Sequence, residues 1–275
     1  MHWEKPNFGN PEERIENNQE EEMMEEKLAE LSKELAEKTR QEGFPVTEDC
    51  RIDMAAFNGV YSAEEIKKDS ELVKRYEKEW YKNVPTEEIK GEKLKRSGEK
   101  LELLKGSIFS KFLGDEFVVV RASSYDDINN KVDNVVLEKE TGNLVCAFDE
   151  VAESSGQRYE KKKEQVLGRN SESRGGSLKY GFKLEKDEED QIRLVLGKVD
   201  FLPIFYMPLP ERHIKEGIKQ LTPLGEKSIH EEKLFTYFVS ILLSQANYLE
   251  LEKNLNPSLK SRLKNFKKTL EKFKS

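Results

Sequence analysis

The chain has 275 residues, of which 36% are hydrophobic, 37% charged and 9% aromatic, and its formal net charge is −7. Fourteen Phe and nine Tyr supply enough apolar surface for one sizeable core, which excludes a chain that is disordered throughout. No stretch reaches the roughly 20 apolar residues that span a bilayer, the N-terminus lacks the apolar segment of a signal peptide, and two cysteines cannot build a disulfide framework. We therefore expect a soluble, cytoplasmic protein without a membrane partner.

The two ends of the chain carry opposite charge. Residues 1–42 hold thirteen Glu against six Lys or Arg, a net of −7, whereas residues 251–275 hold seven Lys and one Arg against two Glu, a net of +6. Opposite charges permit the ends to attract each other or another copy of the chain. A basic end also permits nucleic-acid binding, but the spacing of its Leu and Phe residues favours an amphipathic helix docked on the surface.

The N-terminal part is predicted to be helical. Residues 1–18 are rich in Asn, Glu and Pro, and we expect them to be mobile. A helix follows over residues 20–40, with apolar side chains at a spacing of three to four that either dock within the chain or pair between chains. These side chains are Met24, Leu28, Leu31 and Leu35. Ser62 is a plausible N-cap for a second helix that runs towards Trp80 and Tyr81.

Strands are predicted in the centre of the chain. Ser97 is placed to cap a helix over residues 99–113, and apolar runs at 117–122, 133–138 and 144–151 predict three strands. Residues 139–143 contain Gly142 and predict a hairpin turn between the second and third strands. A helix is expected over residues 157–168.

The remaining elements complete a mixed fold. Residues 178–184 and 192–199 predict a second hairpin around an acidic turn at 186–190, and residues 201–209 contain two prolines, which favours an edge strand. Helices are expected at 211–221, 226–250 and 257–274. We therefore predict an α/β fold with a mixed central sheet in residues 43–225, an acidic, partly disordered helical arm in residues 1–42 and a helical C-terminal extension in residues 226–275.

Acidic residues stand at the ends of two predicted strands. Asp133 opens the second strand, and Asp149 and Glu150 close the third. Because a tight turn makes these strands antiparallel, the start of one lies beside the end of the next, and Asp133 and Asp149 converge where a hard divalent cation finds oxygen ligands. The alternative is that these carboxylates lie near loops and are simply solvated.

A third acid lies on the preceding helix. Glu102 falls at the edge of the apolar face of that helix, from which it could reach the same site. The alternative is that Glu102 extends to solvent or pairs with Lys105 or Lys111.

This segment resembles the PD-(D/E)XK, or restriction-endonuclease-like, nuclease superfamily over about residues 97–168. The core of that superfamily has a helix bearing an acid, a strand, a second strand that starts with Asp, and a third that ends in (Asp/Glu)-X-Lys. The resemblance implies that Asp133 is the metal-binding Asp, Asp149 the second acid and Glu102 the helix acid. The sequence departs from the pattern at the motif lysine, because that position is Val151.

Valine cannot orient a water molecule or stabilise charge on a phosphate. Some members of the superfamily recruit the lysine from the next helix, and Lys161, Lys162 and Lys163 stand in place for that role. Otherwise the chain is a catalytically degenerate relative that binds a partner.

The resemblance implies metal-dependent phosphodiester hydrolysis. The catalytic candidates are Asp133, Asp149, Glu102, Lys161 and Lys162. Mg²⁺ or Mn²⁺, held by Asp133, Asp149 and Glu150, would be the cofactor of an active enzyme, and DNA or RNA its partner. Basic residues that would contact the nucleic-acid backbone are Arg158, Arg169, Arg174 and Lys179. The alternative is a non-catalytic interaction protein that uses its charged helical ends, including self-association through the N-terminal helix.

Overall fold

Four strands form the central sheet of the computed structural model, which describes residues 11–139, 144–172, 174–186 and 192–273. The first three, β1 (Phe117–Arg121), β2 (Asn134–Glu138) and β3 (Leu144–Val151), make an antiparallel meander, as their apolar runs predict. The fourth, β6 (Ile204–Pro208), pairs in parallel with β3, so the strand order is β1-β2-β3-β6. The prediction of a mixed α/β protein is confirmed, and β6 is the edge strand that its prolines predicted.

The connection from β3 to β6 contains a helix and a hairpin. Helix α5 (Gln157–Ser171) is followed by β4 (Gly176–Lys186) and β5 (Ile192–Leu202), which pair with each other as a separate two-stranded sheet. The hairpin is confirmed, and both of its strands are longer than predicted. Most of its acidic turn, like most of the predicted turn at 139–143, lies outside the described residues.

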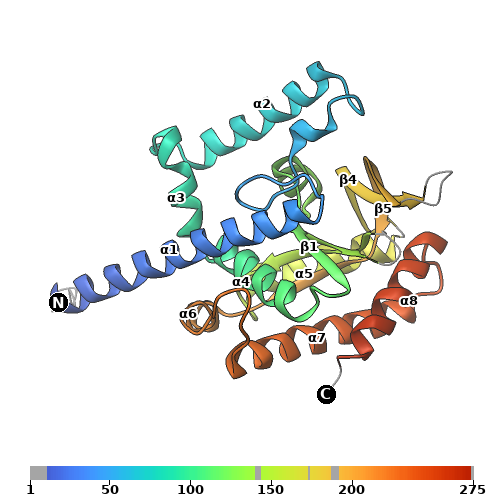
Figure 1. The fold of residues 1–275 in the computed structure, drawn as a ribbon. Helices are drawn as coiled ribbons and strands as arrows, with labels where there is room; N and C mark the ends of the chain where they lie inside the picture. The colour runs from blue at the N-terminus through green and yellow to red at the C-terminus, as the bar shows by residue number, and fades with distance from the viewer. Residues whose placement is uncertain (1–10, 140–143, 173, 187–191, 274–275) are drawn as a thin grey trace, which may run out of the picture.

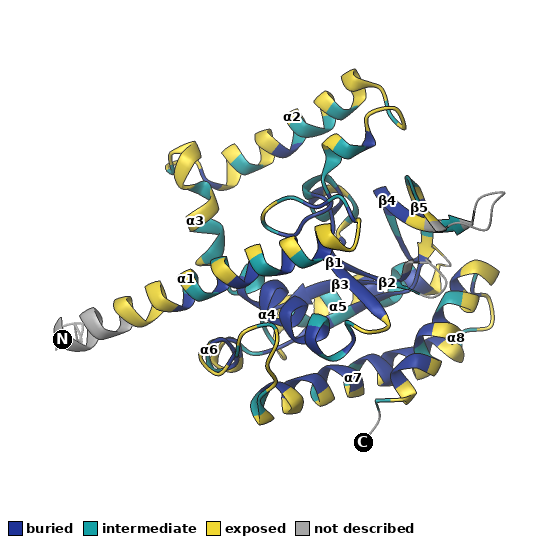
Figure 2. Ribbon diagram, in the orientation of Figure 1, coloured by how far each residue is buried: buried dark blue, intermediate teal, exposed yellow. Residues whose placement is uncertain are grey.

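Each face of the central sheet packs into its own apolar core, which gives the buried centre in Figure 2. We call one the α4 face: Val119, Val136 and Phe148 point towards α4 (Ser97–Phe112) and the helices behind it. We call the other the α5 face: Val118, Val135 and Ala147 point towards α5 and the β4–β5 hairpin. The alternation of side chains along each strand produces this division.

Three C-terminal helices cover the α4 face: α6 (Glu211–Lys219), α7 (Ile229–Glu250) and α8 (Pro257–Glu271). Helix α8 buries Leu259, Leu263 and Phe266 against this core, so the prediction of a docked amphipathic helix is confirmed. None of the helices in the described ranges is long and apolar enough to cross a membrane.

The N-terminal helices lie above the sheet in the view of Figure 1. They are α1 (Pro11–Gln41), α2 (Ala63–Trp80) and α3 (Ile89–Leu94), with 3-10 turns at Met54–Phe57 and Thr86–Glu88. The apolar stripe of α1 docks within the chain, because Leu28 and Leu31 are buried in the same core as α4 and α6.

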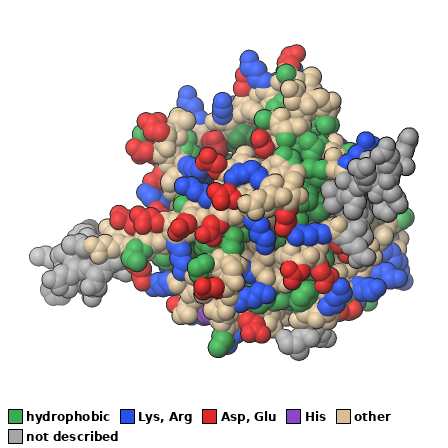
Figure 3. Space-filling model, in the orientation of Figure 1, with side chains coloured by type: hydrophobic (Ala, Val, Ile, Leu, Met, Phe, Trp, Pro, Cys, Tyr) green, Lys and Arg blue, Asp and Glu red, His purple; other side chains and the backbone are tan. Residues whose placement is uncertain are grey.

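Charged side chains hold α1 to its neighbour. Glu21 of α1 lies 2.8 Å from Lys215 of α6, and Glu20 lies 2.5 Å from Lys219. Part of the acidic charge of α1 is therefore compensated within the chain, and Figure 3 shows acidic and basic side chains interspersed over this face of the molecule.

Local signals at helix starts give mixed results. The Ser62 hydroxyl accepts a hydrogen bond from the Glu65 N–H, which confirms the predicted cap of α2. The prediction for Ser97 is wrong: this residue is already helical, and Arg96 is the N-cap without a side-chain bond. Helix α1 also begins at Pro11, before the predicted start at residue 20; proline fits the first turn of a helix, where no backbone donor is needed.

Candidate active site

The two predicted aspartates lie side by side at one end of the sheet. In the ladder between β2 and β3, Asn134 pairs with Phe148, and the N–H of Asp133 donates to the Phe148 carbonyl over 2.9 Å. That bond departs from the register by one residue, so Asp133, which precedes β2, lies at the end of the sheet beside the Phe148–Asp149 segment of β3. Asp149 follows Phe148 of the α4 face on β3 and therefore points to the α5 face, and its charge is the largest that acts on Asp133, so the two carboxylates are neighbours. Both aspartates are buried, so solvation by a loop does not describe them.

A lysine from α5 meets this pair. The Lys162 ammonium is in contact with Asp149 Oδ1, and the Lys162 side chain is 27% exposed, so the contact is open to solvent. Helix α5 packs against β3 and β6, which brings its first turns over the strand end that carries Asp149. Lys161 is exposed on α5, and Lys163 lies 3.7 Å from Glu160.

Acidic side chains that lie close together shift the pKa values of the site. Burial, followed by the charges of Asp149 and Glu102, holds the pKa of Asp133 well above its ordinary value. Burial by itself lowers the pKa of Lys162, but the carboxylates of Asp149 and Asp133 outweigh it, so the net shift is upward. Lys162 is therefore a stable cation beside two acids that repel each other.

Glu150 does not join the aspartate pair. As the next residue on β3 it points to the α4 face, where its carboxylate contacts Lys105 of α4 and accepts a 2.9 Å hydrogen bond from the Asn134 amide. Lys105 is fully buried, and its ammonium lies 4.3 Å from the centre of the Phe148 ring. Burial lowers the pKa of Lys105, and the charge of Asp133 opposes that shift.

Two buried oxygens in this second cluster have no hydrogen-bond partner among the described residues: Glu150 Oε2 and Asn134 Oδ1. A buried polar atom without a partner is costly. The backbone links the two clusters, because the Glu150 N–H donates to Asp133 Oδ2 over 2.6 Å.

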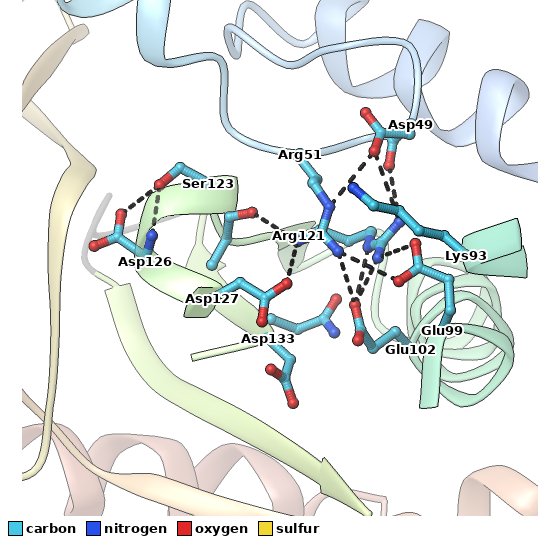
Figure 4. A network of polar contacts seen from close by, with 12 residues as sticks. Asp49, Arg51, Lys93, Glu99, Glu102, Arg121, Ser123, Asp126, Asp127 and Asp133 are labelled. Carbon is cyan, nitrogen blue, oxygen red and sulfur yellow. Dashed lines mark hydrogen bonds and ion pairs between the residues drawn. The ribbon is translucent and has the colours of Figure 1, made fainter. Parts of the chain in front are cut away.

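Glu102 belongs to an ion-pair network at the edge of the site (Figure 4). Its carboxylate accepts hydrogen bonds from Arg121 over 2.7 Å and from Arg51 over 3.4 Å, rather than pairing with Lys105 or Lys111. Arg51 also binds Asp127 at 2.9 Å. In Figure 4 the Asp133 carboxylate points away from these guanidinium groups. Glu102 therefore acts on Asp133 through its charge, without sharing its partners.

The Glu102 carboxylate is buried in this network. Burial and the neighbouring charge of Glu99 raise its pKa to about 7, although Arg121 and Arg51 oppose the shift. Arg121 is shared, because its guanidinium also lies 2.5 Å from Glu99.

The four basic residues predicted to contact nucleic acid lie in different places. Arg158 is mostly exposed and 3.6 Å from Glu153, and Arg174 is exposed and paired with Glu172. Arg169 donates to the Lys131 carbonyl over 3.2 Å, and the charges of Asp149 and Asp133 act on it, so it lies near the aspartate pair.

Lys179 lies in a different cluster. Its ammonium is 2.6 Å from Asp69 and 2.8 Å from Glu65, both on α2, and three tyrosine rings surround it at 5.1 to 5.7 Å. The tyrosines are Tyr61, Tyr125 and Tyr180. This cluster ties α2 to β4, and the lysine charge is compensated there.

A divalent cation fits the aspartate pair in its donor chemistry. No group of three or more His, Cys, Asp or Glu side chains within the described ranges is arranged to hold a metal ion. Mg²⁺ does not need such a group, since it commonly binds through one or two carboxylates and keeps several water ligands. Asp133 and Asp149 supply two carboxylates, and a cation between them would offset the charge of Asp149, which adds to the effect of burial in raising the pKa of Asp133.

Sequence reasoning missed three cations of this region: Lys105, Arg51 and Arg121. Lys105 stands three residues after Glu102, on the flank that the apolar periodicity assigns to the core, and a lysine there signals a buried partner. Arg121 likewise ends an apolar strand, where a charge needs a counterion. Arg51 comes from a loop 71 residues away from Ala122, whose carbonyl it binds, and no local pattern predicts that contact.

Compared with models of protein families, with curated proteins and with solved structures, the chain matches none of them.

Proposed function

We propose that this protein is a metal-dependent nuclease with a restriction-endonuclease-like core of the PD-(D/E)XK type, in which a lysine from α5 replaces the missing motif lysine. One observation carries the proposal: Asp133 and Asp149 are neighbouring buried acids at one end of the sheet, and Lys162 contacts Asp149. The chain order α4, β1, β2, β3 is the order that the resemblance implies.

Each residue has a role in this proposal. Asp133 and Asp149 would hold Mg²⁺ or Mn²⁺, which when bound activates water and polarises the phosphate. Lys162, a cation exposed at its tip, stabilises the negative charge that develops on the phosphate oxygens during hydrolysis. Arg169, on which the charges of Asp149 and Asp133 act, would contact the phosphate backbone.

Val151 is the observation that favours a catalytically degenerate derivative. It is buried at the position of the motif lysine and supplies no charge there. If Lys162 does not replace that lysine in function, the fold would serve only to bind a partner.

The test is cleavage of labelled DNA and RNA oligonucleotides in Mg²⁺ or Mn²⁺ by the wild type and by Lys162→Met. We expect metal-dependent cleavage that falls about 100-fold or more in the variant, because one stabilising donor at a phosphoryl or acyl centre has an effect of that size. The control is Lys161→Met, which removes an exposed lysine from the same helix.

Cleavage that is equal in Lys162→Met and Lys161→Met would show that Lys162 has no catalytic role. A wild type that cleaves neither DNA nor RNA with either metal would remove the nuclease proposal and leave the degenerate derivative.

A further inference from the structure

A groove of about 410 Å³ opens beside the candidate site, at the free edge of β6. We call it the Tyr248 groove. It is lined from three elements, α5, β6 and α7, by Lys163, Leu167, Tyr206, Ser244, Gln245 and Tyr248. Its volume lies within the range of small-molecule sites in proteins.

The sheet register fixes the distance from the groove to the aspartate pair. Tyr206 on β6 is the parallel partner of Asp149 on β3, so their backbones are separated by one strand spacing, about 4.8 Å. Paired residues on neighbouring strands project to the same face. Asp149 and Tyr206 therefore lie side by side on the α5 face, and the groove begins at Tyr206, beyond the last strand.

At the free edge of β6, the backbone N–H and carbonyl of Tyr206 already have hydrogen-bond partners. The walls of the groove therefore remain available to a ligand. Gln245 accepts from the Tyr206 N–H over 3.1 Å and donates to the Tyr206 carbonyl over 2.8 Å, as a neighbouring strand would. The Tyr206 ring is held by Tyr159, whose ring centre lies 5.9 Å away at an edge-on angle of 77°. Both the backbone and the ring of Tyr206, at the floor of the groove, therefore have partners.

The exposed groups of the groove match a nucleotide. Tyr248 is 52% exposed, so its ring is open to a ligand in the groove. Ser244 is exposed one helical turn away on α7, and Lys163 adds a cation from α5. An aromatic ring, a hydroxyl and a cation next to a phosphodiester site are the groups that stack a base, bind its edge and attract its phosphate.

We propose that the Tyr248 groove is the base subsite of the candidate nuclease and holds an unpaired nucleobase against the Tyr248 ring, so that the substrate class is single-stranded nucleic acid. The proposal rests on the nuclease function proposed above. A base can enter the groove only when it is neither paired nor stacked in a duplex, which makes the groove a determinant of strand specificity.

The experiment measures binding without catalysis. Fluorescence anisotropy follows a labelled single-stranded oligonucleotide and its duplex with the full chain in buffer containing EDTA. We expect tighter binding of the single strand, and binding about tenfold weaker in Tyr248→Ala, as expected for the loss of one stacked base. The matched control is Trp80→Ala, which removes an aromatic side chain that is 48% exposed on α2, far from α7 in Figure 1.

Three results would overturn the subsite: wild-type affinity in Tyr248→Ala, equal or tighter binding of the duplex, or no binding of single strands. The outcome is separable from that of the nuclease proposal. A chain that binds single strands through Tyr248 but cleaves nothing in Mg²⁺ keeps the subsite and loses the nuclease, and a chain that cleaves while Tyr248→Ala binds normally keeps the nuclease and loses the subsite.

Discussion

Asp133 is the residue on which the electrostatics of the site depend. Its carboxylate is buried, faces Asp149 and accepts the Glu150 N–H. Burial and the charge of Asp149 raise its pKa above that of the unfolded chain. The stabilisation that a group with a raised pKa contributes is present in full below its unfolded-state pKa and is lost as the pH rises through its folded-state pKa. Without a metal, a negative charge on Asp133 therefore opposes folding, and this effect grows as the pH rises.

The upward shift in the pKa of Asp133 predicts how Asp133→Asn changes the stability of the fold. An amide oxygen can still accept the Glu150 N–H, but the charge is gone, so the variant should unfold at a higher temperature than the wild type at pH 7 to 8 in EDTA. We expect a gain of about 2 °C or more, the shift that 1 kcal/mol produces in a domain of this size. The gain should shrink towards acidic pH, where the wild-type carboxyl is protonated.

Thermal unfolding followed by circular dichroism across this pH range measures the effect. The control is Asp115→Asn, which neutralises an exposed carboxylate. Equal destabilisation of Asp133→Asn at every pH would contradict the account, because it would mean that Asp133 matters only for packing or hydrogen bonding.

Part of the candidate site could be predicted from the positions of its residues along the predicted strands. Asp133 and Asp149 follow from the antiparallel order of two apolar strands, since a tight connection fixes which strand ends meet. The opposite orientation of Glu150 follows from the alternation of side chains along the predicted strand 144–151, so Glu150 could have been excluded as a metal ligand beside Asp149. The partners of Glu102 could not be predicted, because Arg51 reaches it through tertiary contacts from a distant loop.

At the scale of elements, helix α5 supplies lysines to the site, and helix α1 packs on α4, the helix that carries Glu102. Helix α5 carries Lys162 towards the aspartates and Lys163 towards the Tyr248 groove, on adjacent sides of one helix. Helix α1 lies across α4 and α6, and its stripe of apolar side chains is buried.

Helix α1 should therefore be part of the cooperative fold. Leu28→Ala removes a side chain that is fully buried and should lower the free energy of unfolding by about 2–5 kcal/mol, the usual cost of such a truncation. Met23→Ala is the control, because Met23 is 70% exposed on the same helix. Urea denaturation measures both. A Leu28→Ala variant as stable as Met23→Ala would mean that α1 detaches in solution, which would reopen pairing between chains.

The elements themselves could largely be predicted. Strands β1 to β3 are apolar runs bounded by polar turns, and the prolines of β6 mark an edge. The errors lie at helix starts, and the turn after β1 was not predicted. Ser97 has the chemistry of a cap but lies inside the helix, and the π-helical turn Asp126–Asn130 exists because buried Asp126 accepts the N–H groups of Lys179 and Tyr180 from β4. The contacts of Asp126 come from a distant strand, and local patterns do not show them.

At the scale of the whole molecule, the mixed surface charge favours binding of nucleic acid by a few local groups over attraction by one broad basic surface. The net charge is −7, and acidic and basic side chains alternate over the face in Figure 3. A broad basic surface, which gives nucleic-acid binding its strong salt dependence, is not visible on that face. Nucleic-acid binding by this protein would depend on Lys162, Arg169 and the Tyr248 groove, close to the aspartate pair.

The central claim is that Asp133 and Asp149 together hold a divalent cation, and calorimetric titration with Mg²⁺ and Mn²⁺ tests it most directly. The wild type should bind in the low-millimolar range or tighter, and more tightly as the pH rises, because a proton on Asp133 competes with the metal. Asp133→Ala should abolish that binding. No binding by the wild type, or equal binding by Asp133→Ala, would contradict the claim.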